Sequence, residues 1–453
     1  MRHRGWLAYL ALGALGGIAY YYLPVVHKSG PFFNALGGSS VLAILVGTRL
    51  HKPERRLPWY LFAIGQSLFI GGDVITYNYP KFFHHDIPFP SIGDVFYLCV
   101  YPCLIAGILL LIRRRTPGRD RDSLIDSLIV TVGFGLLSWE FLIAPYARDY
   151  TLSLPVKLVS MAYPLMDMLL LAVVVRLAVG AGRRAPAFYV LVFGAAALLG
   201  TDAAYGLYQL SGKIYQNGTL PLEAGWLSFY VLWGAAALHP SMRALTEAPS
   251  RQEPRFTRIR LALLAGGTLM APAVLATQEA RGESLDVPLI VAGSVALFSL
   301  AIARMRGLVR KHELAEGRER ALRKAGASFV GATGWDALYE AAIRATIDLV
   351  GPDAEVRLAL AHEPQEELAV VASVGEEQAR DPLGGRWTEH AAGVIGAASL
   401  PEDIRSRLHD RRVVELLAPA APDRELLQMP DSIGAVTIAP LHIGERLRGL
   451  LIV

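Results

Sequence analysis

The stretch Ala301-Ile-Ala-Arg-Met-Arg-Gly-Leu-Val-Arg-Lys-His-Glu-Leu-Ala-Glu-Gly-Arg-Glu-Arg-Ala-Leu-Arg-Lys-Ala-Gly-Ala-Ser-Phe329 separates two parts of the chain that differ in composition. Before it lie apolar runs joined by short basic or polar loops, and after it the composition is that of a soluble α/β domain. The stretch itself leaves an apolar run with four cations and continues as a charged helix. We therefore predict a membrane bundle over 1–303, a connecting signalling helix over 304–330 and a soluble domain over 331–453.

Apolar residues recur every seven positions along this connecting helix, the seam spacing that lets a helix pair with a copy of itself. The seam residues are Leu308, Ala315, Leu322 and Phe329. His312 and Glu319 interrupt the other half of the seam, so pairing is expected to be weak. Weak pairing suits a switch between two arrangements of similar energy. We expect a homodimer through this helix and the domain after it; the alternative is an unpaired membrane-proximal helix that ends at Gly326.

The composition is that of a membrane protein with a soluble attachment. Hydrophobic residues make up 53% of the chain and charged residues 19%, whereas a soluble globule carries about 25% charged residues. The net charge of +4 comes mainly from loops between apolar runs, so we expect the lipid bilayer as a partner and no nucleic acid. Cys99 and Cys103 lie four residues apart in one run, too distant on a helix for a disulfide.

About ten apolar runs approach the roughly 20 residues that a helix needs to cross the hydrocarbon. They lie at Trp6–Val25, Phe32–Thr48, Trp59–Tyr77, Ile92–Ile112, Leu124–Ala144, Val156–Ala178, Ala187–Leu210, Leu220–Leu238, Ile259–Thr277 and Val287–Ala303. Alternate loops are rich in arginine, at 2–4, 49–56, 113–121, 183–184, 243–260 and 304–311. The positive-inside rule then predicts a multi-pass protein of the plasma (inner) membrane with both termini in the cytoplasm.

Two phrases within the apolar region occur twice. Gly71-Gly-Asp-Val-Ile-Thr-Tyr77 is echoed by Gly200-Thr-Asp-Ala-Ala-Tyr205, each late in a run. After a polar loop, Pro90-Ser-Ile-Gly-Asp-Val-Phe-Tyr97 is echoed by Leu220-Pro-Leu-Glu-Ala-Gly-Trp-Leu-Ser-Phe-Tyr230. The third and fourth runs thus resemble the seventh and eighth in the same orientation, which indicates a parallel duplication.

Six acids lie inside the predicted spans, and each costs about 2.5–3.5 kcal/mol at the bilayer centre. They are Asp73, Asp94, Asp126, Glu140, Asp167 and Asp202. We expect these acids to face the bundle interior or an interface. One hypothesis is a ligand-binding polar pocket that opens outward, formed by Asp73, Asp94 and Asp202 with Tyr77, Tyr97 and Tyr205 as hydrogen-bond donors. The other is that Asp–Tyr pairs fix helix packing, and it is favoured because no basic residue lies nearby to make a proton or ion pathway.

The sequence contains no catalytic motif and no metal-ligand spacing, and it leaves cofactors open. His84 and His85 are adjacent on a predicted loop without two further ligands at a metal-site spacing. His362 and His390 are isolated in the soluble part, where a lone histidine is usually a surface or packing residue. No nucleophile–base arrangement indicates an enzyme within these residues.

The soluble part begins with a helix-period run from Trp335 to Val350, which Gly351-Pro352 ends. Strands are predicted at Glu355–Ala361 and Glu367–Ser373. Helical pieces are expected near Thr388–Ala398 and Glu402–Leu408. A strand at Val413–Leu417 and a final hairpin from Ile433 to Val453 complete an α+β order.

The ending Val436-Thr-Ile-Ala-Pro-Leu-His-Ile-Gly-Glu-Arg-Leu-Arg-Gly-Leu-Leu-Ile-Val453 resembles that of a GAF domain, a small-molecule-binding and dimerising module of bacterial signalling proteins. The resemblance covers Ala325 to Val453. It implies a cytoplasmic GAF-like domain that binds a small molecule. GAF domains normally close with another helix, so this domain is expected to be truncated at its C-terminus.

The whole arrangement, with the phrase Tyr163-Pro-Leu-Met-Asp-Met-Leu-Leu-Leu171, resembles the sensory half of actinobacterial-type membrane proteins that end in diguanylate cyclase and phosphodiesterase domains. That resemblance implies a sensor whose missing output turns over cyclic-di-GMP. Two alternatives remain at this point. His312-Glu-Leu allows the sensory part of a histidine kinase, and the many spans allow a transporter with a regulatory tail.

Overall fold

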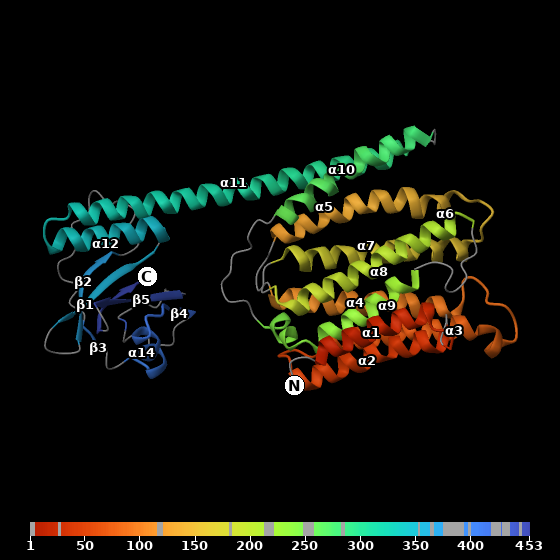
Figure 1. The fold of residues 1–453 in the computed structure, drawn as a ribbon. Coiled ribbons are helices and arrows are strands. Elements are labelled where there is room, and N and C mark those ends of the chain that lie inside the picture. The colour runs from red at the N-terminus through yellow and green to blue at the C-terminus, as the bar shows by residue number, and fades with distance from the viewer. Residues whose placement is uncertain are drawn as a thin grey trace. The chain divides into compact units, whose positions relative to one another are not determined.

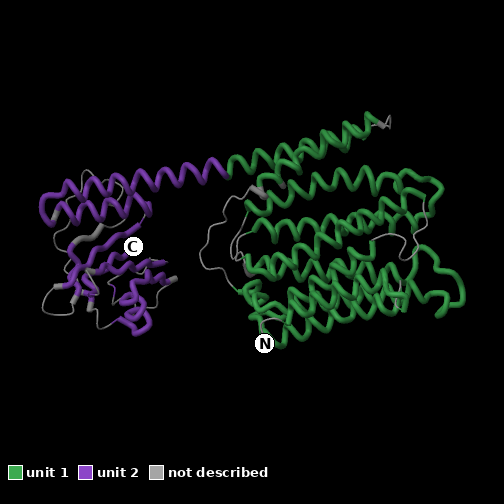
Figure 2. Tube along the Cα trace, in the orientation of Figure 1, with its two compact units in different colours: residues 1–307 green, residues 308–453 purple. Residues whose placement is uncertain are grey.

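A computed structural model describes most of the chain. The described residues are 5–25, 29–115, 121–180, 184–212, 222–247, 258–281, 286–351, 354–362, 367–374, 394–396, 400–417, 427, 435–443 and 446–453. The chain divides into two compact units, Met1–Gly307 and Leu308–Val453, each of which is described by itself (Figure 2).

The first unit consists mainly of long helices that run antiparallel to the next along the chain, except that the short α6 continues the segment begun by α5 (Figure 1). The last of them, α11, extends into the second unit. Their bounds are α1 Gly5–Tyr22, α2 Gly30–His51, α3 Leu57–Phe83, α4 Ile92–Arg115, α5 Arg121–Ser138, α6 Ala144–Arg148, α7 Leu154–Val179, α8 Pro186–Leu210, α9 Leu222–Leu238, α10 Arg258–Arg281 and α11 Val287–Gly331. A π-helical turn, η1, covers Trp139–Ile143, and a 3₁₀ turn, η2, covers Pro240–Leu245.

Among the described residues, six helical segments are long and apolar enough to cross a bilayer. They are Gly30–His51, Ile92–Arg113, Arg121–Arg148, Leu154–Val179, Pro186–Leu210 and Val287–Gly331. The other four predicted spans also lie in helices, namely α1, α3, α9 and α10, and their insertion stays a prediction. The chain therefore has the helices of a multi-pass membrane protein. Its membrane and its orientation stay predictions.

Local sequence explains where several of these helices begin and end. Proline occupies the first turn of α2, α3, α7 and α8, where its fixed φ suits a helix and its missing N–H costs nothing. Helix α2 stops at Lys52 and α3 at His84, both in the left-handed conformation with φ of 45° and 59°. Each donates its backbone N–H to a carbonyl of the last helical turn, which caps the helix.

Six of the helices contact one another in a closed order. Helix α2 packs on α3, α3 on α4, α4 on α7, α7 on α8, α8 on α9, and α9 returns to α2. Their shared core is rich in aromatic residues, and Phe62, Trp233 and Tyr230 are almost fully buried. The helices come close because glycine replaces a side chain at the crossings. At Gly47 an added Cβ would collide with the backbone of Ala237 on α9.

Helices α5, α10 and α11 form a second, smaller core in the same unit. Its buried members are Ile129, Leu136, Ala271, Val274, Ile290 and Leu297. Helices α5 and α10 approach closely at Gly133 and Gly267, where an added Cβ on Gly133 would lie 2.5 Å from the Gly267 carbonyl oxygen. Helix α5 also packs on α7, so it lies between the aromatic core and α11.

The second unit is a helix followed by an antiparallel sheet. Helix α12 covers Trp335–Val350 and ends at Gly351, whose φ of 125° favours glycine. The strands are β1 Val356–His362, β2 Glu367–Val374, β3 Val394–Gly396, β4 Val414–Leu417, β5 Ala435–Ile443 and β6 Arg446–Ile452, with a short helix α14 at Glu402–His409. The sheet order is β3-β2-β1-β6-β5-β4.

Both faces of this sheet are covered. Ile343 of α12 packs with Val356 and Leu358 of β1 on one face. Ile404 and Leu408 of α14 join the core on the other face. The predicted helix at 335–350, the helix at 402–408 and the final hairpin are therefore confirmed as secondary structure.

One helical prediction is wrong where it can be compared. Residues 394–396, predicted as part of a helix near Thr388–Ala398, form β3 and pair with β2. Strand pairing with an existing edge outweighed the local helical pattern; the rest of that piece lies outside the described residues. The GAF-like identity of the unit stays a prediction.

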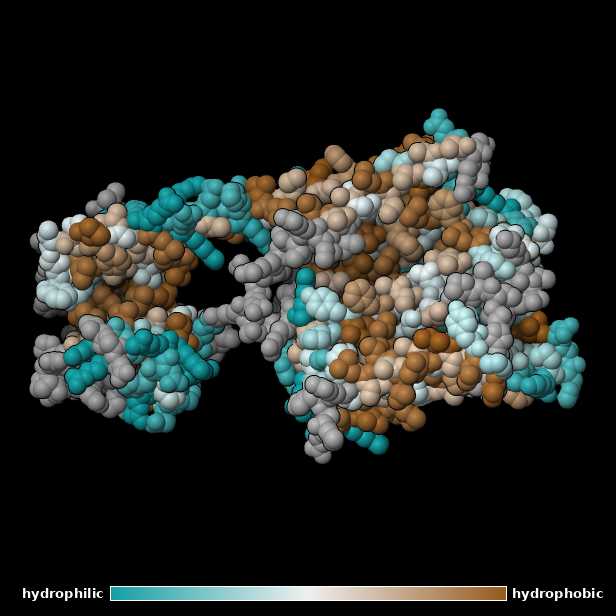
Figure 3. Space-filling view, viewed as in Figure 1, coloured by the Kyte–Doolittle hydropathy of each residue, from teal (hydrophilic) through white to brown (hydrophobic). Residues whose placement is uncertain are grey.

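The surface changes character along the chain. In Figure 3, apolar residues cover much of the visible face of the first unit, and hydrophilic residues gather on the part of α11 that belongs to the second. On that part, the predicted seam residues Leu322 and Phe329 are 59% and 40% exposed. The seam is thus uncovered in the single chain, and its pairing stays a prediction.

Candidate functional site

Five buried or half-buried acids in the first unit accept hydrogen bonds from aromatic side chains of other helices. We call this set the tyrosine–carboxylate network. Its acids are Asp73, Asp94, Asp167, Asp202 and Glu223, and its donors are Tyr21, Tyr97, Tyr101, Tyr163, Trp226 and Tyr230. The donors are neutral groups, and the network joins α1, α3, α4, α7, α8 and α9.

Asp73 of α3 receives two tyrosine hydroxyls. Tyr97 of α4 donates to its Oδ1 at 2.9 Å, and Tyr230 of α9 donates to its Oδ2 at 3.4 Å. Asp73 is 4% exposed. The side chain of Tyr97 lies against Gly72, where any Cβ would collide with the ring. The glycine before Asp73 therefore makes room for the tyrosine that bonds it.

Asp94 occupies the first turn of α4. Its Oδ2 accepts from the backbone N–H of Ser91 at 2.7 Å and from the Ser91 hydroxyl at 3.0 Å. This is the reach-back half of a capping box, and a carboxylate at this position also favours the helix dipole. Tyr163 of α7 donates to its other oxygen at 2.7 Å. Asp94 thus caps its own helix and fastens α7 to it.

Tyr101 of α4 stands between two aspartates. Its hydroxyl lies 2.9 Å from Oδ1 of Asp167 on α7 and 3.5 Å from Oδ2 of Asp202 on α8. The indole N–H of Trp226 donates to the other oxygen of Asp202 at 2.8 Å. One α4 hydroxyl therefore contacts two helices that follow much later in the chain.

Glu223 connects the network to the first helix. The Tyr21 hydroxyl of α1 donates to Glu223 Oε2 at 3.2 Å and accepts from the backbone N–H of Ala224 at 3.0 Å. Glu223 is 1% exposed in the first turn of α9. A carboxylate there complements the N-terminal end of the helix dipole.

The six predicted site residues take different places. Asp73, Asp94 and Asp202 are all in the network, and Tyr97 is the donor for Asp73. Tyr205 lies beside it: its hydroxyl accepts from Gln209 at 2.6 Å, and its ring packs edge-on against Trp226 with centroids 5.7 Å apart. Tyr77 is half-buried one turn beyond Asp73, and among the described residues no hydrogen bond of its hydroxyl to the network is seen.

Sequence reasoning missed most of the donors. Tyr101, Tyr163, Tyr230 and Trp226 supply bonds that the motif search did not assign. A usable signal existed for one of them, because Tyr97 and Tyr101 are four residues apart and share a helix face. Nothing in the sequence indicated that Tyr230 would reach back to Asp73.

Helix α11 is fastened to α5 by a buried ion pair, the Arg304 clamp. Arg304 Nε donates to Asp126 Oδ1 at 2.7 Å, and its NH1 lies 3.3 Å from Asp122 Oδ2. Arg304 is 5% exposed and Asp126 1% exposed. Both carboxylates lie in the first two turns of α5, where the helix dipole favours negative charge.

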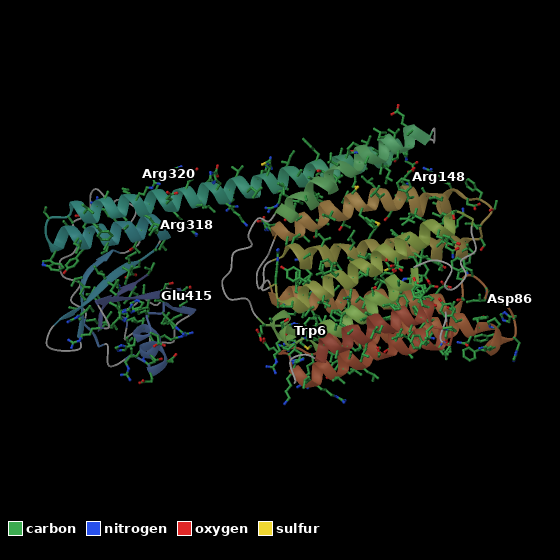
Figure 4. The ribbon with its side chains drawn as sticks, viewed as in Figure 1. Trp6, Asp86, Arg148, Arg318, Arg320 and Glu415 are labelled. Atoms are coloured by element: carbon green, nitrogen blue, oxygen red, sulfur yellow. The ribbon has the colours of Figure 1, made fainter. Side chains whose placement is uncertain are left out.

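A second contact, the Asp286 clamp, fastens the start of α11. Asp286 precedes the helix and accepts from the indole N–H of Trp139 at 2.9 Å, and it forms an ion pair with Arg148. Figure 4 shows Arg148 and Asp86 at one end of the unit and Trp6 at the other. The π-helical turn η1 carries Trp139 and also Glu140, which accepts from Gln278 of α10 at 2.5 Å. Such turns are frequent at functional positions.

The histidines considered in the sequence as possible ligands are not placed in a metal site where the structure describes them. Among the described residues, no group of three or more His, Cys, Asp or Glu is placed to hold a metal ion. The exposed ring of His85 packs on Tyr79 and Phe83, with centroids 5.3 and 6.4 Å apart. His390 and the side chain of His362 lie outside the described residues.

Comparison with known proteins found no matching family model, curated protein or solved structure.

Proposed function

We propose that this chain is the sensory part of a membrane signal-transduction protein, which relays a membrane or extracytoplasmic stimulus to a cytoplasmic GAF-like domain. The observation that carries the proposal is the continuity of α11. This helix of 45 residues begins in the apolar core of the first unit and continues, without a break, as the charged rod of the second. One helix therefore contains residues of both units.

The two clamps support a transmitting role for α11. Asp286 and Arg304 are 18 positions apart, which on a helix is about 27 Å, close to the thickness of a bilayer core. Arg304 bonds α5, and Asp286 bonds η1 and α6, which continue α5 as the single span Arg121–Arg148, here called the α5 segment. Residues at both ends of that distance are therefore held to the α5 segment. Helix α5 in turn packs on α7, which carries Tyr163 and Asp167 of the network. A chain of packed helices thus joins the network to the rod.

The mechanism we propose is a population shift. A stimulus that favours one arrangement of the tyrosine–carboxylate network changes the position of α7 and α5, and the clamps pass that change to α11. A ligand can shift such an equilibrium by its differential affinity for the two states. The rod would pass the change to the GAF-like domain and to an output of the cyclic-di-GMP type.

Cysteine cross-linking of the rod tests this proposal in the whole 453-residue chain in nanodiscs. With Cys99 and Cys103 replaced by alanine, Leu322→Cys reports rod pairing, and Leu314→Cys, off the seam and 58% exposed, is the matched control. Tyr230→Phe, a variant in the network, is expected to change the rate of cross-linking at Leu322→Cys at least twofold.

An unchanged rate at Leu322→Cys with Tyr230→Phe would contradict a relay from network to rod. Sustained solute flux through the purified chain in proteoliposomes would contradict the receptor class itself, because it would make the bundle a transporter with a regulatory tail. The two outcomes address different parts of the proposal.

A further inference from the structure

The repeated phrases of the sequence lie in equivalent helices. Gly71–Tyr77 is in α3 and Gly200–Tyr205 is in α8, each followed by a polar loop and a helix that begins with the second phrase. The match extends beyond those phrases: Trp59-Tyr60 near the start of α3 corresponds to Phe188-Tyr189 near the start of α8, at the same spacing from the aspartate. Trp59 and Phe188 are both buried.

Helix crossings repeat with the sequence. The matched glycines Gly93 of α4 and Gly225 of α9 each lie against a threonine of the helix before, Thr76 and Thr201, so closely that a Cβ would collide with its hydroxyl. The two threonines are not matched positions, because Thr201 matches Gly72. A Cβ on Gly93 would also lie 3.6 Å from the carbonyl oxygen of Gly72, so each hairpin, α3–α4 and α8–α9, crosses at the corresponding glycine. This is structural agreement that two short sequence matches alone could not supply.

The helix before each hairpin completes the repeat. In the closed order of six helices, α2 stands next to α3 as α7 stands next to α8, and the two junctions α4–α7 and α9–α2 correspond. A parallel repeat of three helices needs an odd number of helices between its copies, since each copy must start from the same side. The α5 segment supplies that one connecting helix (Figure 1).

Hydrogen bonds of the network connect the two sets of three helices, α2–α4 and α7–α9. Asp73 receives Tyr97 from its own set and Tyr230 from the other. Asp202 receives Trp226 from its own set, and the Tyr101 hydroxyl of the other set lies 3.5 Å away. The matched aspartates are thus bonded in the same way, once within the set and once across it.

Two further carboxylate bonds cross between the sets, from Tyr163 to Asp94 and from Tyr101 to Asp167. Ring contacts cross there too, with Phe62 4.6 Å from Trp233 and Phe69 5.5 Å from Tyr230 between centroids. Polar bonds in an apolar bundle are geometrically specific, while ring packing tolerates sliding. Each hydrogen bond across the boundary therefore depends on the relative position of the two sets, because hydrogen bonds weaken steeply when donor and acceptor separate or lose their alignment.

We propose that the bundle consists of two duplicated three-helix halves, α2–α4 and α7–α9, joined by α5, and that the tyrosine–carboxylate bonds across their boundary are the contacts that break and re-form when the halves move relative to each other. The movement rests on the proposed function, whereas the duplication does not. Since α5 connects the halves and also carries both partners of the Arg304 clamp, a relative movement of the halves reaches α11 directly.

Asp73 provides a matched pair of variants for the test. Tyr230→Phe removes a bond that crosses the boundary, and Tyr97→Phe removes a bond of the same kind to the same carboxylate within one half. Spin labels at the equivalent positions Tyr60→Cys and Tyr189→Cys, which are 37% and 47% exposed, report the distance between halves in nanodiscs. Cys99 and Cys103 are replaced by alanine first.

Tyr230→Phe is expected to broaden the distribution of distances between the labels or to add a second peak. Tyr97→Phe is expected to leave that distribution as it is in the labelled chain without either substitution. Equal distributions in all three proteins, or equal broadening by both variants, would overturn the proposal. Tyr101→Phe is a second cross-boundary variant in case Tyr230→Phe does not fold. Because the labels report the halves alone, a positive result with an unresponsive rod would refute the relay and keep the moving halves.

Discussion

Individual side chains show how this bundle tolerates carboxylates in an apolar interior. An unpaired charge at the centre of a membrane costs about 2.5–3.5 kcal/mol by insertion scales, and here Asp73, Asp167 and Glu223 are bonded by tyrosine hydroxyls. A tyrosine supplies a donor without adding a second charge to desolvate. The arrangement suits both hypotheses drawn from the sequence, a ligand-binding pocket and Asp–Tyr pairs that fix helix packing. Hydrogen bonds that fix packing in one state can break and re-form when a ligand favours another.

Loss of the Tyr101 hydroxyl is expected to destabilise the bundle. Tyr101→Phe removes the donor between Asp167 and Asp202, and interhelical hydrogen bonds in membrane proteins contribute about 0.6 kcal/mol each, up to about 1.7. We expect the free energy of unfolding to fall by about 1 kcal/mol, measured by denaturant unfolding in mixed micelles. Tyr189→Phe, at an exposed position of α8, is the control and should change little. Equal losses in both variants would contradict the assignment.

His239, between α9 and η2, makes stability depend on pH. Its Nδ1 accepts from the backbone N–H of Ser241 at 3.0 Å, and its ring packs on Trp6 at 4.7 Å. Burial, and less strongly the neighbouring His51, lower the pKa of His239 from its usual 6.5. Because the unfolded chain binds the proton more readily, this contribution is complete above the unfolded pKa and is lost as pH falls through the folded pKa.

The melting temperature of the wild-type chain is therefore expected to decrease as the pH falls from about 7 to about 5. His239→Asn keeps a side-chain acceptor at the start of η2 without a titrating group, so its melting temperature should change less over the same range. The measurement is differential scanning fluorimetry of the solubilised chain at each pH. Parallel curves for both proteins would show that other groups dominate.

At the scale of elements, the sequence predicted the positions of helices well, but it did not predict local irregularities or contacts between helices. Long apolar runs predicted the helices because helix length in a bilayer is set by thickness, and Gly351 predicted the end of α12 because its backbone is left-handed. The π-helical turn at Trp139–Ile143 was not predicted; its Glu140 and Leu142 contact α10 and α8. Similarly, Asp73 was recognisable as a buried acid, but its partner Tyr230 follows from how helices pack.

The Arg304 clamp is expected to be the strongest single attachment of α11. Arg304→Gln removes the buried ion pair between Arg304 and Asp126, and breaking a buried pair costs about 3–5 kcal/mol. Hydrogen exchange of α11 backbone amides near residue 304 should accelerate strongly. Arg306→Gln, two residues later and exposed, is the matched control.

Removing both charges tests the cause of that effect. The double variant Arg304→Gln with Asp126→Asn should exchange more slowly than Arg304→Gln alone, because it also removes the buried charge that Arg304 bonds. If the double variant were as unprotected as the single one, packing of the arginine side chain would explain the loss better than its charge.

At the scale of the whole molecule, the uncovered seam on the rod predicts self-association. Leu322 and Leu314 are 59% and 58% exposed on the same helix, but the first lies on the seven-residue repeat and the second does not. Leu322→Lys should shift the solubilised chain towards monomer in mass photometry, whereas Leu314→Lys should not. Equal effects of both substitutions would indicate a general change in solubility.

The length of α11 also sets the direction in which the seam faces around the helix axis. Each residue of an α-helix turns the chain by about 100°, so an unbroken helix of 45 residues fixes the azimuth of its far end relative to its near end. Seven residues inserted after Leu314 would return the seam to within about 20° of its original bearing, while two would rotate it by about 200°. Under the proposed relay, rods whose lengths differ by sevens keep the bearing of the seam, and other lengths rotate it without a stimulus.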